Sequence, residues 1–215
     1  MLLQNLIVYE NEHVILVNKP AGIPSIKTAN DKSLHEYLNE YFNQKLFVVH
    51  RLDKDASGLI IFAKNSETHK YLNYQFEHNL IEKKYYAVCH GNLENESTMI
   101  KSRIKEFGSG RMGVDEAGRE AITKVKLIKN YRKYFLADIS IYFGRRHQIR
   151  VHLYSIGHPI VGDKLYGNIK HQKNYSRLML HAYFIKFNLF DQKNIELQIP
   201  VAKEMDDFLS DQNIY

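Results

Sequence analysis

Residues 121–143 (AITKVKLIKNYRKYFLADISIYF) alternate apolar and polar side chains over most of their length. Successive side chains of a strand point to opposite faces, so this period of two predicts an antiparallel hairpin with its turn near Asn130–Lys133. Shorter apolar or β-branched runs, typical of further strands, occur at 13–20, 58–63, 84–91, 178–187 and 194–200. Strand pairing therefore dominates what this chain can fold into.

Helical patterns are fewer and occur at 33–42, 66–78, 147–157 and after Pro200. The first opens on Ser33 with Glu36 three residues later, which is the capping-box pattern. The second opens on Ser66, and Gly157 is suited to cap the C-terminus of the third. Because strands outnumber helices and come mostly as hairpins, we expect an α+β fold. Its core would be a mixed, mainly antiparallel β-sheet with flanking helices.

The composition is that of a globular protein, with 44% hydrophobic and 25% charged residues in 215. No linker or repeat divides the chain, so we expect a single domain over residues 1–215. The formal charge of +6 favours an anionic partner. One cysteine, Cys89, excludes a disulfide framework. The longest apolar run (59–63) is too short to span a membrane, and we expect no secretory signal, so the protein would be cytoplasmic. Nothing in the sequence suggests an obligate dimer, so we expect a monomer.

A polar cluster lies directly before the buried strand predicted at 58–63. It contains His50, Arg51, Asp53 and Lys54. Cations beside Asp53 would keep its carboxylate ionised, so that it could act as a nucleophile or a base. A loop of surface ion pairs explains the same residues equally well at this point.

A second basic cluster, FGRRHQIR, opens the helix predicted at 147–157. Arg146 and Arg150 are four residues apart and would face the same way, with His147 close by. Gly144 would let an anion approach the helix N-terminus. A generic phosphate-binding helix is the alternative interpretation.

Two further segments are less specific. Tyr85 lies in the strand pattern KKYYAVCHG, where a tyrosine more often packs in a core than reacts. The stretch 101–133 contains ten basic and four acidic residues, with GSGRMG as a flexible tip, and we expect it to form loops that suit a phosphate backbone. A solvated surface is the alternative for its individual lysines.

Several activities are excluded by pattern. The chain has no GxxxxGK[ST] and no GxSxG motif. GSGRMG at 108–113 has the GxGxxG spacing, but it lies at an expected hairpin tip and opens no predicted helix, so it does not indicate a dinucleotide site. Its eleven histidines show no HExxH or other metal-ligand spacing. We therefore expect neither a metal nor a nucleotide cofactor.

In this order, the segments resemble the RluA family of RNA pseudouridine synthases. HRLDKDASGLIIFAK is similar to the family's HRLDxxTSGLxxxAK, KKYYAVCHG to KxYxAxxxG, and GRRHQIRVHLYSIGHPIVGDKLYG to GRxHQIRxHxxxxGxPIxGDxxYG. The opening NEHVILVNKPAGIPS is also similar, and the resemblance spans about residues 6–200. Ala56 and Phe143 stand where the family usually has threonine. We expect no N-terminal S4 domain.

The resemblance implies the pseudouridine synthase catalytic fold and a cofactor-free isomerisation of specific uridines in RNA. Asp53 would be the essential carboxylate, either adding to the ribose or base or assisting glycosidic cleavage. Tyr85 would stack on the target uracil. Arg150 would pair with Asp53 and keep it ionised and aimed.

The resemblance also implies an RNA-binding surface, and the RNA would be an rRNA or tRNA stem-loop. Arg51 would enter the base stack that the flipped uridine leaves. The other side chains expected on phosphates or just behind the site are His50, Arg146, His147, Gln148, Lys83 and Arg111. The alternative is an RNA-binding protein without chemistry, and the joint presence of Asp53, Tyr85 and Arg150 favours the enzyme.

Overall fold

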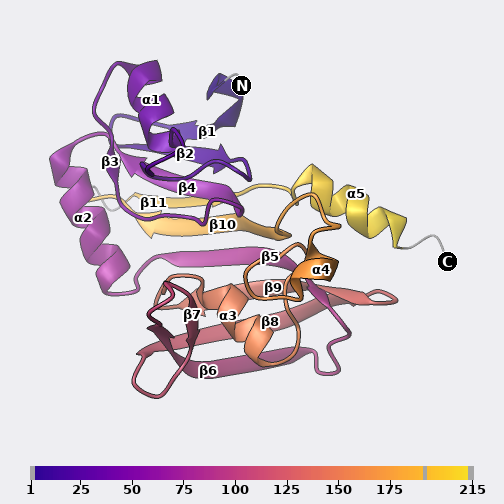
Figure 1. The fold of residues 1–215 in the computed structure, drawn as a ribbon. Coiled ribbons are helices and arrows are strands. Elements are labelled where there is room, and N and C mark those ends of the chain that lie inside the picture. The colour runs from indigo at the N-terminus through magenta and orange to yellow at the C-terminus, as the bar shows by residue number, and fades with distance from the viewer. Residues whose placement is uncertain (1–2, 191–192, 213–215) are drawn as a thin grey trace. The chain divides into compact units, whose positions relative to one another are not determined.

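The computed structural model describes residues 3–190 and 193–212 and divides the chain into two compact units. The first contains the described residues up to Lys83 together with Ala182–Pro200. The second contains Lys84–His181 and the described residues from Val201 on. Each unit combines antiparallel strands with helices (Figure 1), which confirms the α+β class with a mainly antiparallel sheet.

The first unit is built on strands that pair in the order β1–β2–β4–β10–β11. The short β3 also pairs with β4. The bounds of these strands are β1 Ile7–Glu10, β2 Val14–Lys19, β3 Phe47–Val48, β4 Ser57–Ala63, β10 Leu180–Asn188 and β11 Asn194–Gln198. All seven residues of β4 are buried, as expected for the apolar run after the Asp53 loop. This strand is the rigid element that carries that loop.

Helices α1 (Leu34–Phe42) and α2 (Ser66–Glu77), and the 3-10 helix η1 (Leu3–Leu6), complete the first unit. The capping box at α1 is confirmed, because the Ser33 hydroxyl accepts from the Glu36 N–H and the Glu36 carboxylate accepts from the Ser33 N–H. At α2 the expected cap was one residue too late. The Asn65 side chain, not Ser66, accepts from the Thr68 N–H.

The second unit is a sheet in the order β5–β9–β8–β6–β7. Its strands are β5 Glu82–His90, β6 Ser97–Glu106, β7 Met112–Val114, β8 Arg119–Asn130 and β9 Tyr134–Tyr142. The hairpin predicted at 121–143 is confirmed, since β8 ends and β9 begins on either side of the expected turn. The loops expected over residues 101–120 of the basic stretch are largely strands, because these residues lie on β6, β7 and the start of β8 on either side of a short turn. Ile100, Ile104 and Val125 are buried while alternate polar residues face outward.

Three helices belong to the second unit: α3 (Gln148–Ser155), α4 (Ile169–Gln172) and α5 (Lys203–Asp211). Helix α3 lies against β6, β7 and β8 (Figure 1). It confirms the helix predicted near 147–157, and Gly157 follows it with a positive φ of 83°. None of the described helices is both long and apolar enough to cross a membrane.

Candidate functional site

Hydrogen bonds from the end of β2 and from the turn that follows it fix the loop that carries Asp53. The fully buried Lys19 ammonium donates to the carbonyl oxygens of Pro20 (2.9 Å), Ile23 (2.8 Å) and Lys54 (3.0 Å). The buried Ser25 hydroxyl donates to the Leu52 carbonyl at 2.8 Å and accepts from its N–H at 3.1 Å. These bonds leave the backbone on both sides of Asp53 little freedom.

The residues around Asp53 alternate in burial. Arg51 is exposed, Leu52 points into the core and Asp53 is half-buried. An exposed guanidinium beside an anchored backbone can reach a ligand without moving the loop. Lys54, expected to flank Asp53, instead pairs with the Asp31 carboxylate at 2.8 Å. The charge pattern does not identify Lys19 or Ser25 as residues that support the site, although both lie in the NKPAGIPS segment that resembles the family.

His50 anchors the same loop to β4. Its Nε2 accepts from the Ile61 N–H at 3.0 Å, and its ring stacks on Phe76 with the centroids 4.8 Å apart. Burial, with a smaller contribution from Lys83, lowers the pKa of His50 to about 3. The imidazole is therefore neutral at pH 7, so a phosphate contact through a positive His50 is not available. Any neutral contact with RNA stays a prediction.

Lys83 shares this environment. Its ammonium lies 5.0 Å from the Phe76 ring centroid, and burial lowers its pKa to about 8. A lysine with such a pKa is still mostly charged at pH 7. Its expected contact with RNA stays a prediction.

Tyr85 lies on β5 opposite Ile139 of β9 and is 7% exposed. Tyr85 and Ala87 are both buried, while Tyr86 between them is half-buried, so the alternation expected of this strand is present. A ring fixed on a strand that pairs with β9 has a defined orientation, which any stacking role requires.

Arg150 forms a buried, bidentate ion pair with Asp163. Its Nε and Nη2 donate to the two carboxylate oxygens at 2.8 and 2.9 Å, and the side chains are 7% and 0% exposed. Asp163 Oδ1 also accepts from the N–H groups of Leu165 (2.9 Å) and Tyr166 (3.0 Å). Asp163 thus fixes the guanidinium and the following turn together. The pairing of Arg150 with Asp53 stays a prediction.

The sequence did not predict Asp163 as a partner of Arg150, although Asp163 lies in the PIVGDKLYG segment that resembles the family. Thirteen residues separate it from Arg150 in the chain. Only the fold of the turn after α3 brings the carboxylate to the guanidinium. A carboxylate after two turn-forming residues, Pro159 and Gly162, was the available signal.

The expected helical neighbours of Arg150 have different roles. Arg146 lies before α3 and not in it, and it pairs with Glu106 at 2.6 Å. His147 has a left-handed backbone with φ of 55°, and its Nδ1 is 2.8 Å from the Tyr166 hydroxyl. The buried Gln148 amide donates to the carbonyls of Ile122 (2.9 Å) and Tyr142 (3.1 Å). Gln148 therefore positions the start of the helix, and contacts of Arg146 and His147 with RNA stay predictions.

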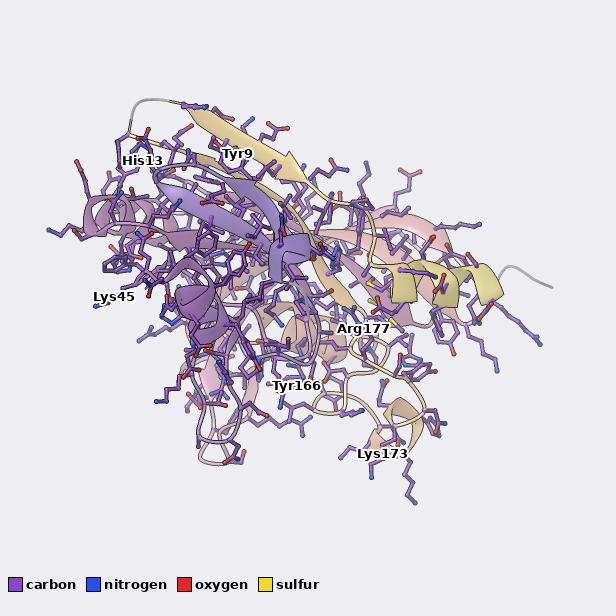
Figure 2. The ribbon with its side chains drawn as sticks, turned by 90° about the horizontal axis from the view of Figure 1, so that it is seen from above. Tyr9, His13, Lys45, Tyr166, Lys173 and Arg177 are labelled. Atoms are coloured by element: carbon purple, nitrogen blue, oxygen red, sulfur yellow. The ribbon has the colours of Figure 1, made fainter. Side chains whose placement is uncertain are left out.

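Arg111 lies in the turn between β6 and β7. Its exposed guanidinium is 5.1 Å from the centroid of the Tyr166 ring and 5.9 Å from that of Tyr154. Tyr166, labelled in Figure 2, comes from the segment between α3 and α4. A guanidinium near aromatic rings gains a cation–π attraction, and because Arg111 is exposed it can still reach a ligand. Its expected contact with RNA stays a prediction.

Within residues 3–190 and 193–212, no three His, Cys, Asp or Glu side chains gather where they could hold a metal ion.

The family model of RNA pseudouridylate synthases matches residues 13–155. The chain is 34% identical to ribosomal large subunit pseudouridine synthase D of Borreliella burgdorferi, over 85% of this chain and 61% of that protein. It is 36% identical to the dual-specificity RNA pseudouridine synthase RluA of Vibrio cholerae, over 82% of this chain and 74% of that protein. An uncharacterized RNA pseudouridine synthase of Zymomonas mobilis is 30% identical, with 96% and 98% covered.

The fold is similar to that of human RNA pseudouridylate synthase domain containing 1, with a TM-score of 0.81 and 20% identity. That alignment covers 97% of this chain and 94% of the human one. The chain spans less than two thirds of the length of the Borreliella relative and nearly all of the Zymomonas one.

Proposed function

The chain belongs to the family of RNA pseudouridylate synthases, and on that premise we propose that it isomerises specific uridines in structured RNA through the carboxylate of Asp53. The observation that carries the proposal is the clamped loop. Lys19 and Ser25 hold the backbone around Asp53, and the fully buried β4 follows it. A reacting group gains most from such support, because geometry within about 0.5 Å decides its efficiency.

The reaction requires no oxidant and no external energy. The glycosidic bond from ribose C1′ to N1 of the base breaks, the base rotates, and a bond from C1′ to C5 forms. The C5 hydrogen leaves as a proton and N1 takes up a proton, so the product is an isomer of the substrate. Asp53 acts at the sugar or the base, and Tyr85 stacks on the uracil. Arg150, oriented by Asp163, pairs with Asp53 and stabilises its charge.

These residues come from both units of the fold, so we propose that residues 1–215 act as one catalytic domain. The substrate is an rRNA or tRNA stem-loop, bound in the cytoplasm by the monomer without a metal or a cofactor. Arg51 fills the stack that the flipped base leaves, which offsets part of an unstacking cost of a few kcal/mol. The surplus of ten basic over four acidic residues in 101–133 supports binding to phosphates.

The testing experiment uses transcribed rRNA and tRNA labelled with tritium at C5 of uridine. Each turnover releases that hydrogen to water, so released tritium counts product. We expect Asp53→Asn to release none while its RNA affinity stays within a few-fold of wild type. The matched control is Asp55→Asn, since Asp55 is an exposed carboxylate two residues away.

Retained turnover by Asp53→Asn would remove Asp53 from this role. If the wild type binds RNA tightly and releases no tritium from any transcript, the alternative of an RNA-binding protein without chemistry replaces the proposal.

A further inference from the structure

A pocket of about 370 Å³ opens in the second unit, and neither Asp53, Tyr85 nor Arg150 lines it. It lies between the β6–β7 turn, β7, helix α3 and the segment that carries Tyr166. The residues that shape it most are Phe107, Arg111, Met112, Val151, Tyr154 and Tyr166. This volume falls in the range of pockets that enclose a small planar ligand.

The floor of the pocket is rigid. Val151 and Tyr166 are 2% and 1% exposed, and they belong to a small core cluster with Ile104 and Ala121. The Tyr166 hydroxyl accepts from the Met112 N–H at 3.1 Å and lies 2.8 Å from His147 Nδ1. The ring is thus held from two sides before any ligand arrives.

The walls are aromatic rings that the fold leaves open to solvent. Phe107 is 43% and Tyr154 is 48% exposed. The Phe107 ring lies so close over Gly113 that a Cβ there would come within 2.7 Å of it. Any side chain at position 113 would displace the ring. Exposed rings that line a hollow mark binding sites more often than chance surface.

The charge around the pocket selects its ligand. The Arg111 guanidinium contacts the rings of both Tyr154 and Tyr166, and the surrounding stretch 101–133 is strongly basic. Unpaired nucleobases stack on aromatic rings and on guanidinium planes, and their phosphates need nearby cations. An apolar peptide would use the rings and leave the positive charge without a counterpart.

We propose that this pocket binds an unpaired nucleobase of the RNA substrate, distinct from the uridine that is isomerised. The base stacks on the exposed part of the Tyr154 ring, beside the Arg111 guanidinium. The inference rests on the proposed function for the identity of the RNA, while the pocket itself does not contain Asp53, Tyr85 or Arg150.

The ring of Tyr166 lies between the pocket and Arg150. The Arg150 guanidinium lies 5.2 Å from the Tyr166 ring centroid, and the same ring forms the pocket floor. A base held there therefore belongs to a nucleotide near the target in the folded RNA. Two anchored bases fix the register of the RNA strand, so the pocket selects which uridine is presented.

The test compares Tyr154→Leu, which keeps an apolar side chain but loses the ring, with Tyr154→Phe, which keeps the ring. The control is Tyr41→Leu, because Tyr41 lies in the first unit and is also 48% exposed. Binding of transcribed rRNA and tRNA is measured at several salt concentrations, and tritium release is measured in parallel. Transcripts containing 4-thiouridine are crosslinked to the wild type, and the crosslinked peptides are identified by mass spectrometry.

We expect Tyr154→Leu to weaken RNA binding about ten-fold, as the loss of one stacked base does. The salt dependence of binding should stay the same, because no phosphate contact is lost. Tyr154→Phe and Tyr41→Leu should bind within two-fold of wild type, and crosslinks should map to the peptides that contain Phe107 or Tyr154.

Binding by Tyr154→Leu within two-fold of wild type, while the wild type releases tritium, would overturn the pocket inference alone. An equal loss in Tyr154→Phe and Tyr154→Leu would also overturn it, since it would assign the effect to the hydroxyl. If the wild type releases no tritium and, among the three variants, only Tyr154→Leu binds RNA more weakly, the proposed reaction is refuted and the pocket is supported as a base-binding site.

Discussion

Replacing Asp163 with alanine tests whether the buried ion pair holds the second unit together. The change removes the carboxylate to which the Arg150 guanidinium, which is 7% exposed, donates at 2.8 and 2.9 Å. Leaving one charge of such a pair buried costs about 3–5 kcal/mol. The N–H groups of Leu165 and Tyr166 lose their acceptor as well, which adds about 1 kcal/mol for each if water does not replace it.

Asp163→Asn separates these contributions. The amide oxygen can still accept from the two N–H groups of the turn, while the negative charge is lost. We therefore expect Asp163→Asn to be less destabilised than Asp163→Ala and still clearly weaker than wild type.

The free energy of unfolding is measured by urea titration with far-UV circular dichroism, because the chain has no tryptophan to report by fluorescence. The control is Asp207→Ala, whose partner Lys203 is 82% exposed. That variant should unfold like wild type, since exposed pairs contribute little. A loss below about 1 kcal/mol in Asp163→Ala would refute the reasoning, because it would mean that the guanidinium does not depend on this carboxylate.

Three further predictions follow from single residues. Arg150→Lys keeps the charge but not the bidentate geometry, so tritium release should fall by more than RNA affinity does; an equal fall in both would make Arg150 a phosphate contact. Gly162→Ala places a Cβ 1.8 Å from the Arg177 carbonyl and should lower the melting temperature far more than Gly157→Ala, which has a similar φ but open space around it. The pKa of His50 lies near 3 in the folded chain and near 6.5 in the unfolded one, so stability is complete above pH 6.5 and declines as the pH falls toward 3. The decline should be at most about 1.4 kcal/mol per pH unit, and a His50→Gln variant with the same decline would contradict this assignment.

Local secondary structure was predictable from the sequence where it depends on residues that are neighbours in the chain. The Ser33–Glu36 capping box, the 121–143 hairpin and the helix after His147 all follow from patterns shorter than one element. The loops expected over residues 101–120 are wrong. Lysines and arginines there conceal the strand pattern of β6, in which Ile104 is buried, and strand pairing outweighs the glycines.

The candidate site was predictable in its residue types and less so in its contacts. The sequence predicts His50 as a polar member of the cluster around Asp53. In the structure its ring accepts from the Ile61 N–H and stacks on Phe76. Asp163 reaches Arg150 only through the tertiary fold, which the periodic pattern of side chains in the sequence does not predict. The pocket beside Tyr154 has the same origin, because its rings come from the β6–β7 turn, helix α3 and the segment between α3 and α4.

The central claim is that Asp53 performs the isomerisation, and mapping pseudouridine directly tests it. Total RNA that lacks the modification is incubated with wild type and with Asp53→Ala, and pseudouridines are located as carbodiimide-dependent stops of reverse transcription. The account predicts new stops at specific uridines with wild type and none with the variant. The same stops with both proteins, or none with a wild type that binds the RNA tightly, would contradict it.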